Sequence, residues 1–558
     1  MRFDYELPTD RQFSALQYPA LAISPDGKQF VYSTAEGLFL RSVDEFTAKL
    51  IAGTQGSTSQ PFFSPDGKWV GYLSVADFTL KKININGGAP ATLCNITPFG
   101  VDWRTDGTII CGQTAGDLMI VSSNGGSPEP LLKSKLGVCL YPQMLPDAKT
   151  VLYTAAVPQP RIMVQSIESG EPKELFAGIA ARYLPTGHIV YGLSDSNSLF
   201  AVPFDLDTLK VTGGAVPVVE NVISPLHYVI SDSGTLIYIP GTTPSGSSYR
   251  RSIVWVDRNG KEEPLSAEPN DYRTPRISPD GTKVTWTVVA GEKADIWTWD
   301  ISRETPTRLT FDGLNRYPLW TPDGGRIAFA KGDARSGLSM SIYWKAADGT
   351  GAEEKLGSAQ DQLLLPWSWS KDGNTMALFE ADISAGINYN VGILSMEGNR
   401  EWKSLLKENY IEFQPKISPD GKWVAYTSSE SGQVEIYARP FPDLDKGKWQ
   451  VSTSGGDTPL WSPDGRELFY RNGNAVMGVS VETDPGFKVG KPATLFQGNY
   501  VLLSTDDGQP WDIHPDGKRF LMIKPAAPSG GESTAETLHK INIVLNFFEE
   551  LKEKAPLK

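Results

Sequence analysis

The sequence has few of the residues that build metal, redox or disulfide sites. Its 558 residues include three cysteines, Cys94, Cys111 and Cys139, and four histidines. No two cysteines have the C-x-x-C spacing of a zinc or redox site, and an odd number argues against a disulfide framework. We therefore expect the cysteines to be small core residues, and the sequence predicts no metal site and no cofactor.

Long apolar runs and clusters of positive charge are also absent. No stretch approaches the roughly 18 apolar residues of a membrane span, and residues 1–20 lack the apolar run of a signal peptide. The formal net charge of −13 disfavours binding to a nucleic-acid backbone, and no Lys/Arg run would attract an anionic membrane. These absences predict a soluble chain without nucleic-acid binding or membrane insertion.

Catalytic signatures are missing as well. The sequence contains no Gly-x-Ser-x-Gly nucleophile elbow and no His-Glu-x-x-His zinc motif. The histidines, His188, His227, His514 and His539, are scattered along the chain. We therefore expect a protein that is not an enzyme.

What the sequence does contain is a short repeat of turn-forming residues. Five strict copies of Ser-Pro-Asp-Gly begin at Ser24, Ser64, Ser278, Ser418 and Ser462. Seven looser copies begin at Arg104, Leu145, Leu184, Ser231, Thr321, Ser370 and His514. The copies recur about every 45 residues, which is the length of a four-stranded β-propeller blade.

Each residue of the repeat suits a tight turn between two strands. Pro fixes φ at about −65°, Asp can bond to its own backbone, and Gly takes the left-handed conformation that closes the turn. Strand-like runs follow the turns, as at residues 423–427. A calcium ladder is the alternative role for the Asp residues, but the Gly-Gly-x-Gly-x-Asp repeat of such ladders is absent.

We expect an all-β fold of twelve four-stranded blades. Because one propeller typically has about four to eight blades, two six-bladed β-propellers in tandem are favoured. Residues 241–249 are rich in Gly, Ser and Thr and are typical of a linker. The first propeller is therefore predicted at residues 1–245, and the second, with a short C-terminal helix, at residues 246–558. Either end of the chain can complete a blade.

The Ser-Pro-Asp-Gly blades resemble the repeats of TolB-type propellers. Several stretches, such as residues 255–265, 437–442 and 519–524, are similar to the propeller region of large bacterial serine/threonine receptor kinases. A kinase domain and a membrane helix precede the propellers in those proteins, whereas this sequence has no Gly-rich loop and no His-Arg-Asp catalytic loop. No catalytic residue of the family therefore carries over to this chain.

The resemblance implies a module that binds a ligand or a protein, with the sensor part of a receptor as one form. Its location would be extracytoplasmic in a receptor kinase and otherwise cytoplasmic. Two alternatives stay open. One is a lyase or glycan hydrolase that uses the propeller channel, which requires two carboxylates or several histidines converging on the axis. The other is a Tol-type scaffold that docks a partner protein.

A binding site is expected where the chain enters each innermost strand, because these strands line the channel of a propeller. In the second ring the candidates are Arg273, Arg316, Tyr317, Phe413, Gln414, Asp457 and Trp511. A weaker set in the first ring is Arg182, Tyr183 and His227. Guanidinium groups can hold carboxylates and aromatic rings supply rigid contact area, which predicts a peptide, protein or small-molecule ligand. The alternative is that most of these side chains pack between blades.

Overall fold

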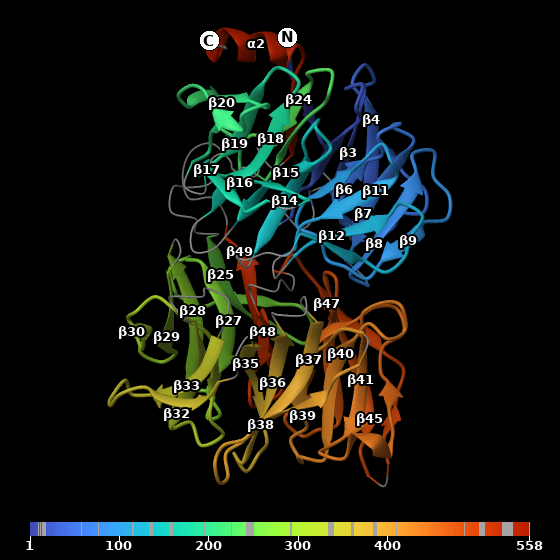
Figure 1. The fold of residues 1–558 in the computed structure, drawn as a ribbon. Coiled ribbons are helices and arrows are strands. Elements are labelled where there is room, and N and C mark those ends of the chain that lie inside the picture. The colour runs from blue at the N-terminus through green and yellow to red at the C-terminus, as the bar shows by residue number, and fades with distance from the viewer. Residues whose placement is uncertain are drawn as a thin grey trace. The chain divides into compact units, whose positions relative to one another are not determined.

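The computed structural model describes residues 1–8, 11, 13, 18–56, 58–75, 77–113, 117–132, 138–155, 160–168, 170–193, 196–224, 226–241, 250–290, 293–332, 340–358, 362–382, 388–408, 410–484, 486–501, 508–526 and 539–556. They form two compact units, one made of Met1–Ser245 with Pro528–Lys558 and the other of Gly246–Ala527 (Figure 1). Apart from Gly241, the predicted linker at residues 241–249 lies outside the described residues.

Unit 1 contains six antiparallel sheets of four or five strands in its described residues. Five sheets are continuous in sequence: β2–β5, β6–β9, β10–β13, β14–β17 and β18–β22, and the sixth has the order β1-β50-β24-β23. The elements are β1 (Arg2–Glu6), β2 (Leu21–Ile23), β3 (Gln29–Thr34), β4 (Gly37–Ser42), β5 (Lys49–Leu50), β6 (Thr58–Phe63), β7 (Trp69–Ser74), β8 (Thr79–Asn84), β9 (Ala91–Cys94), β10 (Val101–Trp103), β11 (Thr108–Cys111), β12 (Leu118–Ser122), β13 (Glu129–Leu132), β14 (Cys139–Met144), β15 (Thr150–Ala155), β16 (Arg161–Ser166), β17 (Lys173–Ala177), β18 (Ile179–Leu184), β19 (His188–Gly192), β20 (Leu199–Asp205), β21 (Lys210–Val211), β22 (Val216–Val219), β23 (Tyr228–Ile230), β24 (Leu236–Tyr238), β50 (Lys540–Val544) and the helix α2 (Phe547–Lys554).

Unit 2 repeats this plan over its own described residues. Its blades are β27–β30, β31–β34, β35–β38, β39–β42, β43–β47 and a closing sheet of order β26-β25-β49-β48; a single bridge, Met340 to Leu363, joins the second and third. The elements are β25 (Arg251–Asp257), β26 (Glu262–Pro264), β27 (Tyr272–Ile277), β28 (Lys283–Ala290), β29 (Lys293–Asp300), β30 (Thr305–Arg308), β31 (Asn315–Trp320), β32 (Arg326–Gly332), β33 (Met340–Ala346), β34 (Glu354–Gly357), β35 (Gln362–Trp369), β36 (Thr375–Asp382), β37 (Asn388–Ser395), β38 (Trp402–Leu406), β39 (Glu412–Ile417), β40 (Trp423–Ser428), β41 (Glu435–Pro440), the 3₁₀ turn η1 (Leu444–Lys446), β42 (Trp449–Gln450), β43 (Asp457–Trp461), β44 (Glu467–Asn472), β45 (Ala475–Glu482), β46 (Lys488–Val489), β47 (Ala493–Gln497), β48 (Trp511–Ile513) and β49 (Arg519–Pro525).

In each unit the first strands of successive blades contact one another and surround an axis. In unit 2 these contacts run from β27 through β31, β35 and β39 to β43, and β48 contacts β27 to close the ring. Apolar clusters fill the space between neighbouring blades, for example Trp255 and Leu521 of the closing blade against Trp286 of the next. The predicted all-β fold of twelve blades in two rings is therefore confirmed, and its core lies between blades rather than at the axis.

The repeat forms the expected turn between the first and second strands of a blade. In the first copy, Ser24 Oγ donates a hydrogen bond to Asp26 Oδ1 at 2.6 Å, and Asp26 Oδ1 also accepts one from the backbone N–H of Lys28 at 3.1 Å. The Ser24 hydrogen bond lowers the pKa of Asp26. Gly421 closes a later turn with a φ of 73°, so the turn role of the repeat is confirmed.

Both ends of the chain close the first ring. β50 lies between β1 and β24, with Phe3 opposite Ile543 and Tyr238 opposite Asn542. The helix α2 follows and packs on unit 1, where the His188 imidazole is hydrogen-bonded to the Ala555 carbonyl at 2.6 Å. In Figure 1 this red helix lies beside the green and blue strands of unit 1.

The boundary predicted for the second ring is therefore wrong at its C-terminal end. Residues 528–558, with β50 and α2, belong to unit 1 and not to a domain of residues 246–558. The chain leaves the first ring after β24, builds the second ring, and returns as the next strand of the same sheet. The physical reason is ring closure, since a blade that combines distant strands removes the unpaired edges of an open sheet.

Candidate binding site

Each blade of the second ring has one inner-strand residue two positions before the first residue of the turn, and the charged members of this set lie near the axis. These residues occupy equivalent registers on their strands: Arg276, Leu319, Ser368, Lys416, Leu460 and Asp512. Arg276 and Lys416 come from the first and fourth blades, which are opposite in a ring of six, yet the Arg276 charge lowers the pKa of Lys416. Side chains of opposite blades approach each other only near the axis.

The axial charges are unevenly matched. Asp512 accepts hydrogen bonds from the backbone N–H groups of Ile277 at 2.9 Å and Ile513 at 3.0 Å. Within the described residues neither Arg276 nor Lys416 forms an ion pair with a carboxylate. Burial, and secondarily the Arg276 charge, lower the pKa of Lys416 to about 7. Two cations thus share the axis with one carboxylate whose oxygens are already bonded to the backbone.

Of the two arginines predicted at the mouth, one is paired and one is not. Arg273 donates to both oxygens of the buried Asp271, from Nε at 3.1 Å and from Nη2 at 3.0 Å. Arg316 is half-buried, and its side chain makes no hydrogen bond or ion pair with any described residue. Arg316 is therefore the predicted cation that remains available to a ligand.

Phe413 and Gln414 contact neighbouring blades, and the Tyr317 ring lies near Gly508 of the closing blade. All three are buried. The Phe413 ring packs 6.2 Å from Phe379, and Gln414 Oε1 accepts a hydrogen bond from the backbone N–H of Thr458 at 2.8 Å. Inter-blade packing, the alternative that the sequence left open, describes Phe413 and Gln414.

Asp457 and Trp511 join the same inter-blade network. Asp457 accepts a hydrogen bond from the Thr458 hydroxyl at 2.8 Å; burial raises its pKa, and the nearby Arg471 opposes that shift. The Trp511 side chain is 0% exposed, and its indole N–H donates to the Thr458 hydroxyl at 3.0 Å. Trp511 consequently offers no free surface to a ligand, and ligand binding by the predicted set as a whole stays a prediction.

The three predicted residues of the first ring also differ in their surroundings. Arg182 lies at the axial register of its blade, donates to the Pro142 carbonyl at 3.1 Å and lowers the pKa of the buried Asp102 against the larger, opposing effect of burial. Tyr183 packs its ring 5.9 Å from Phe204. His227 is 2% exposed. Only Arg182 of these three faces the axis.

A bulge in five of the six inner strands of the second ring accounts for most of the offset between predicted and observed axial residues. In β31 the pairing register shifts between Arg316 and Leu319, and Tyr317 has a φ of 57°. Pro318 follows, and it has no N–H to lose from the ladder. The side chains before and after the Pro therefore do not keep the simple alternation of a regular strand.

Sequence reasoning missed Arg276 and Lys416 because it selected residues before the bulge. The signal that could have found them is the Pro three positions before the turn, as in Pro275 and Pro415. An exposed aromatic residue, Phe311, was missed too.

Phe311 stands at the tip of an ordered loop that leads from β30 into β31. Its side chain is 67% exposed. The buried Asp295 accepts hydrogen bonds from four groups of this loop: Arg308 Nη2 (2.7 Å), Thr310 Oγ1 (2.8 Å), the Gly313 N–H (3.2 Å) and Asn315 Nδ2 (3.1 Å). The Arg308 guanidinium lies 5.1 Å from the Phe311 ring centre, and the Lys345 ammonium lies 5.9 Å from it. The loop thus presents an exposed aromatic ring close to two cationic groups.

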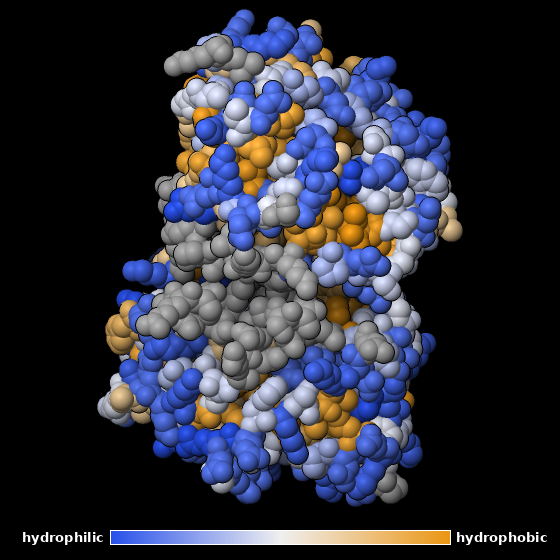
Figure 2. All heavy atoms as spheres, viewed as in Figure 1, coloured by the Kyte–Doolittle hydropathy of each residue, from blue (hydrophilic) through white to orange (hydrophobic). Residues whose placement is uncertain are grey.

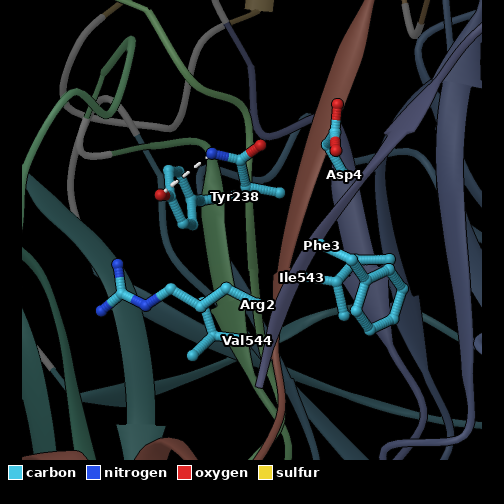
Figure 3. Close-up of a pocket in the computed structure, with 7 residues that line it drawn as sticks. Arg2, Phe3, Asp4, Tyr238, Ile543 and Val544 are labelled. Carbon is cyan, nitrogen blue, oxygen red and sulfur yellow. Dashed lines mark hydrogen bonds between the residues drawn. The ribbon is translucent and has the colours of Figure 1, made fainter.

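On the face that Figure 2 shows, hydrophilic residues predominate among the coloured atoms, with hydrophobic areas between them in both units. Besides Phe311, the large hydrophobic residues exposed among the described residues are Met1 and Phe46. A shallow hollow of about 250 Å³ lies over the closing sheet of unit 1, where Arg2 and Tyr238 face one side of the strands and Phe3 packs on Ile543 (Figure 3). Arg2 Nη2 donates a hydrogen bond to Glu550 Oε2 at 2.6 Å, so one residue of the hollow's lining links β1 to α2.

Two features are absent from the part of the chain that the structure describes. No group of three or more His, Cys, Asp or Glu side chains is placed there to hold a metal ion. No helix there is long and apolar enough to cross a membrane. The three cysteines are buried and free, as expected.

Two closed rings of four-stranded blades define a β-propeller protein. No family model matches the chain. It is 30% identical over 204 residues to the uncharacterized protein Atu1656 of Agrobacterium fabrum, covering 33% of this chain and 68% of that protein. It is also 24% identical over 285 residues to the Tol-Pal system protein TolB of Francisella tularensis subsp. mediasiatica, covering 48% of this chain. The fold is thus a TolB-like β-propeller, as the repeats predicted, and its sequence is similar to that of TolB.

The likeness to TolB is partial. The alignment spans 62% of the length of the Francisella protein. The crystal structure of TolB from Acinetobacter baumannii has 18% sequence identity and a TM-score of 0.33, over 56% of this chain and 81% of that one. The similarity to kinase propeller regions stays a prediction.

Proposed function

We propose that the chain is a protein-docking β-propeller of the Tol type, and that its second ring binds a partner protein through the loop that carries Phe311. The observation that carries the proposal is the exposure of this ring on a loop fixed by Asp295. An exposed aromatic side chain on a preformed loop loses little conformational entropy on binding, which is how interface hot spots gain affinity.

The surroundings of Phe311 indicate the chemistry of the partner. Arg308 and Lys345 flank the ring, and Arg316 follows on the next strand without a partner among the described residues. The matching surface on the partner is an apolar pocket with acidic side chains at its rim. Complementary charges of this kind steer association and are weakened by salt.

The comparison with relatives adds a second line of support. The relative from Francisella is named as a component of the Tol-Pal system, which makes docking to another protein the favoured role for this chain. The axial registers of the second ring carry one carboxylate, Asp512, whereas the enzyme alternative requires two carboxylates or several histidines. Docking is therefore the function we propose.

Site-specific photo-crosslinking in the producing bacterium tests the proposal. A photoreactive phenylalanine analogue at position 311 should yield one defined adduct, whereas the same analogue at the exposed Phe46 of the other ring should not. The purified partner should then bind Phe311→Ala about tenfold or more weakly, on the scale of a hot-spot residue. Phe46→Ala is the matched control. Several adducts of equal intensity, or equal affinity of Phe311→Ala and wild type, would overturn the proposal.

A further inference from the structure

The axis of the second ring places two cations opposite each other without a matching pair of anions. Arg276 belongs to β27 and Lys416 to β39, and Asp512 of β48 is the acidic residue that acts on both. Because Asp512 already accepts two backbone N–H groups, its remaining capacity to neutralise the pair is small. Buried charges in proteins are normally paired or ligated.

Polar atoms around Arg276 are also left without partners. Gln509 is 0% exposed, and neither its Oε1 nor its Nε2 forms a hydrogen bond with a described residue. The same holds for Arg276 Nε and for the indole Nε1 of Trp367. These groups are neighbours, since Arg276 Nη1 donates to the Gln509 carbonyl at 3.4 Å and its guanidinium lies 5.9 Å from the Trp367 ring.

Apart from the acceptor Gln509 Oε1, these atoms without partners have one property in common. Arg276 Nε, Trp367 Nε1 and Gln509 Nε2 are all N–H donors, and Lys416 adds an ammonium group. A water molecule could accept from such donors but would leave the excess positive charge in place. An anion with several oxygens satisfies the donors and the charge together.

The first ring shows how the same position looks when its charges balance. There the axial registers hold one acid, Asp102, and one base, Arg182. Asp102 accepts a hydrogen bond from the Met144 N–H at 2.8 Å, and Arg182 acts on its pKa. The second ring departs from this arrangement by an additional cation. Of the two axes, the axis of the second ring is therefore the one with excess positive charge that an external anion can neutralise.

We propose that Arg276 and Lys416 bind an oxyanion, a carboxylate or a sulfate- or phosphate-like group, on the axis of the second ring. Gln509 and Trp367 supply the neutral N–H donors of the same site. The site does not depend on docking at Phe311, because its residues lie on other strands and face the axis. A carboxylate from a docked protein and a free small anion present the same oxygens to it.

Isothermal titration calorimetry of the whole chain with sodium sulfate and with sodium acetate, at constant ionic strength, tests the proposal. We expect binding of one anion per chain. A higher affinity for sulfate would indicate a site for a tetrahedral oxyanion, and a higher affinity for acetate would indicate a site for a carboxylate. Lys416→Met should weaken binding about tenfold or more, the scale of a lost charge-assisted hydrogen bond. The affinity for sulfate, which does not titrate near neutrality, should fall as pH rises above 7, because Lys416 loses its proton in the presence of Arg276 and Asp512.

Lys422→Met is the matched control, since this exposed lysine lies in the same blade and its removal changes the net charge equally. It should leave anion binding unchanged. Arg276→Gln provides a second variant, with its melting temperature checked for folding. Absence of binding by both anions up to about 10 mM, well above the range of a built site, would overturn the proposal, as would equal binding by Lys416→Met and wild type. Neither result bears on the crosslink at position 311.

Discussion

At the scale of single residues, Lys416 makes the stability of the second ring depend on pH. Its pKa is lowered from 10.5 to about 7, first by burial and then by Arg276. Between these two values the unfolded chain binds the proton that the folded chain has lost, so stability rises with pH across this window. Lys416→Met removes this dependence.

The expected difference is a slope of at most about 1.4 kcal/mol per pH unit between wild type and Lys416→Met from pH 7 to pH 10. Urea unfolding at a series of pH values measures it, and Lys422→Met should follow the wild-type curve. Parallel curves for wild type and Lys416→Met would show that Lys416 keeps its ordinary pKa.

Glu412 should give a dependence of opposite sign. It is 0% exposed, neither carboxylate oxygen bonds to a described residue, and burial raises its pKa to about 7, with Arg439 acting against burial. Between pH 4.5 and 7 the folded chain holds a proton that the unfolded chain has released, so stability falls as pH rises. Glu412→Gln should therefore stabilise the chain by about 1–3 kcal/mol at pH 8 and by much less at pH 4.5.

Chemical unfolding of Glu412→Gln at these two pH values measures the effect. Glu397→Gln serves as the control, because the Glu397 carboxylate lies at the surface. This substitution should not change the free energy of unfolding at either pH. A lower stability of Glu412→Gln than of wild type at pH 8 would mean that the charged Glu412 carboxylate stabilises the folded chain.

At the scale of the element, the repeat turn gives a paired prediction. Gly421 has a φ of 73°, and nothing lies within 4 Å of the place that a Cβ would take, so Gly421→Ala meets no clash but adopts a disfavoured conformation. Ala148 occupies the same position of a degenerate copy with a φ of 55°. Gly421→Ala should cost about 1 kcal/mol, and Ala148→Gly should return a similar amount. Differential scanning calorimetry checks both, and equal signs would contradict the turn assignment.

The same element shows what the sequence can and cannot predict. Turn, blade and ring number follow from local chemistry, since Pro, Asp and Gly act within four residues. The direction of the inner-strand side chains does not, because the bulge at Tyr317-Pro318 rotates the strand by tertiary packing. Phe413 and Trp511 were therefore predicted at the mouth but lie between blades, whereas Lys416, a few residues after Phe413, reaches the axis.

At the scale of the whole molecule, the sequence does not reveal that the residues of the second ring are inserted, in chain order, between two strands of the first ring. Residues 541–546 are recognisable as a strand, but their partners are chosen by register with residues about 300 and 540 positions away. Leu236 pairs with Val544 and Tyr238 with Asn542, in the antiparallel order of a hairpin. The second ring thus occupies the position of a hairpin loop between β24 and β50.

This topology predicts which parts of the chain fold alone. Residues 250–526 contain every described strand of the second ring, including its closing sheet, and should melt cooperatively as an isolated fragment. Residues 1–241 lack β50, which separates β1 from β24, so this fragment should aggregate through its open sheet. Cutting once near residue 245 therefore leaves the first ring incomplete.

A shortened chain without the second ring tests whether β50 closes the first ring. Since Tyr238 already faces Asn542 in antiparallel register, joining Gly241 to His539 through two glycines replaces the second ring with a tight hairpin connection. This chain should be monomeric and melt cooperatively, because its closing blade regains β50 and the helix α2 regains the contact of Ala555 with His188. Size-exclusion chromatography and calorimetry measure both properties. Aggregation of the shortened chain, together with a folded fragment of residues 1–241, would show that β50 is not what closes the first ring.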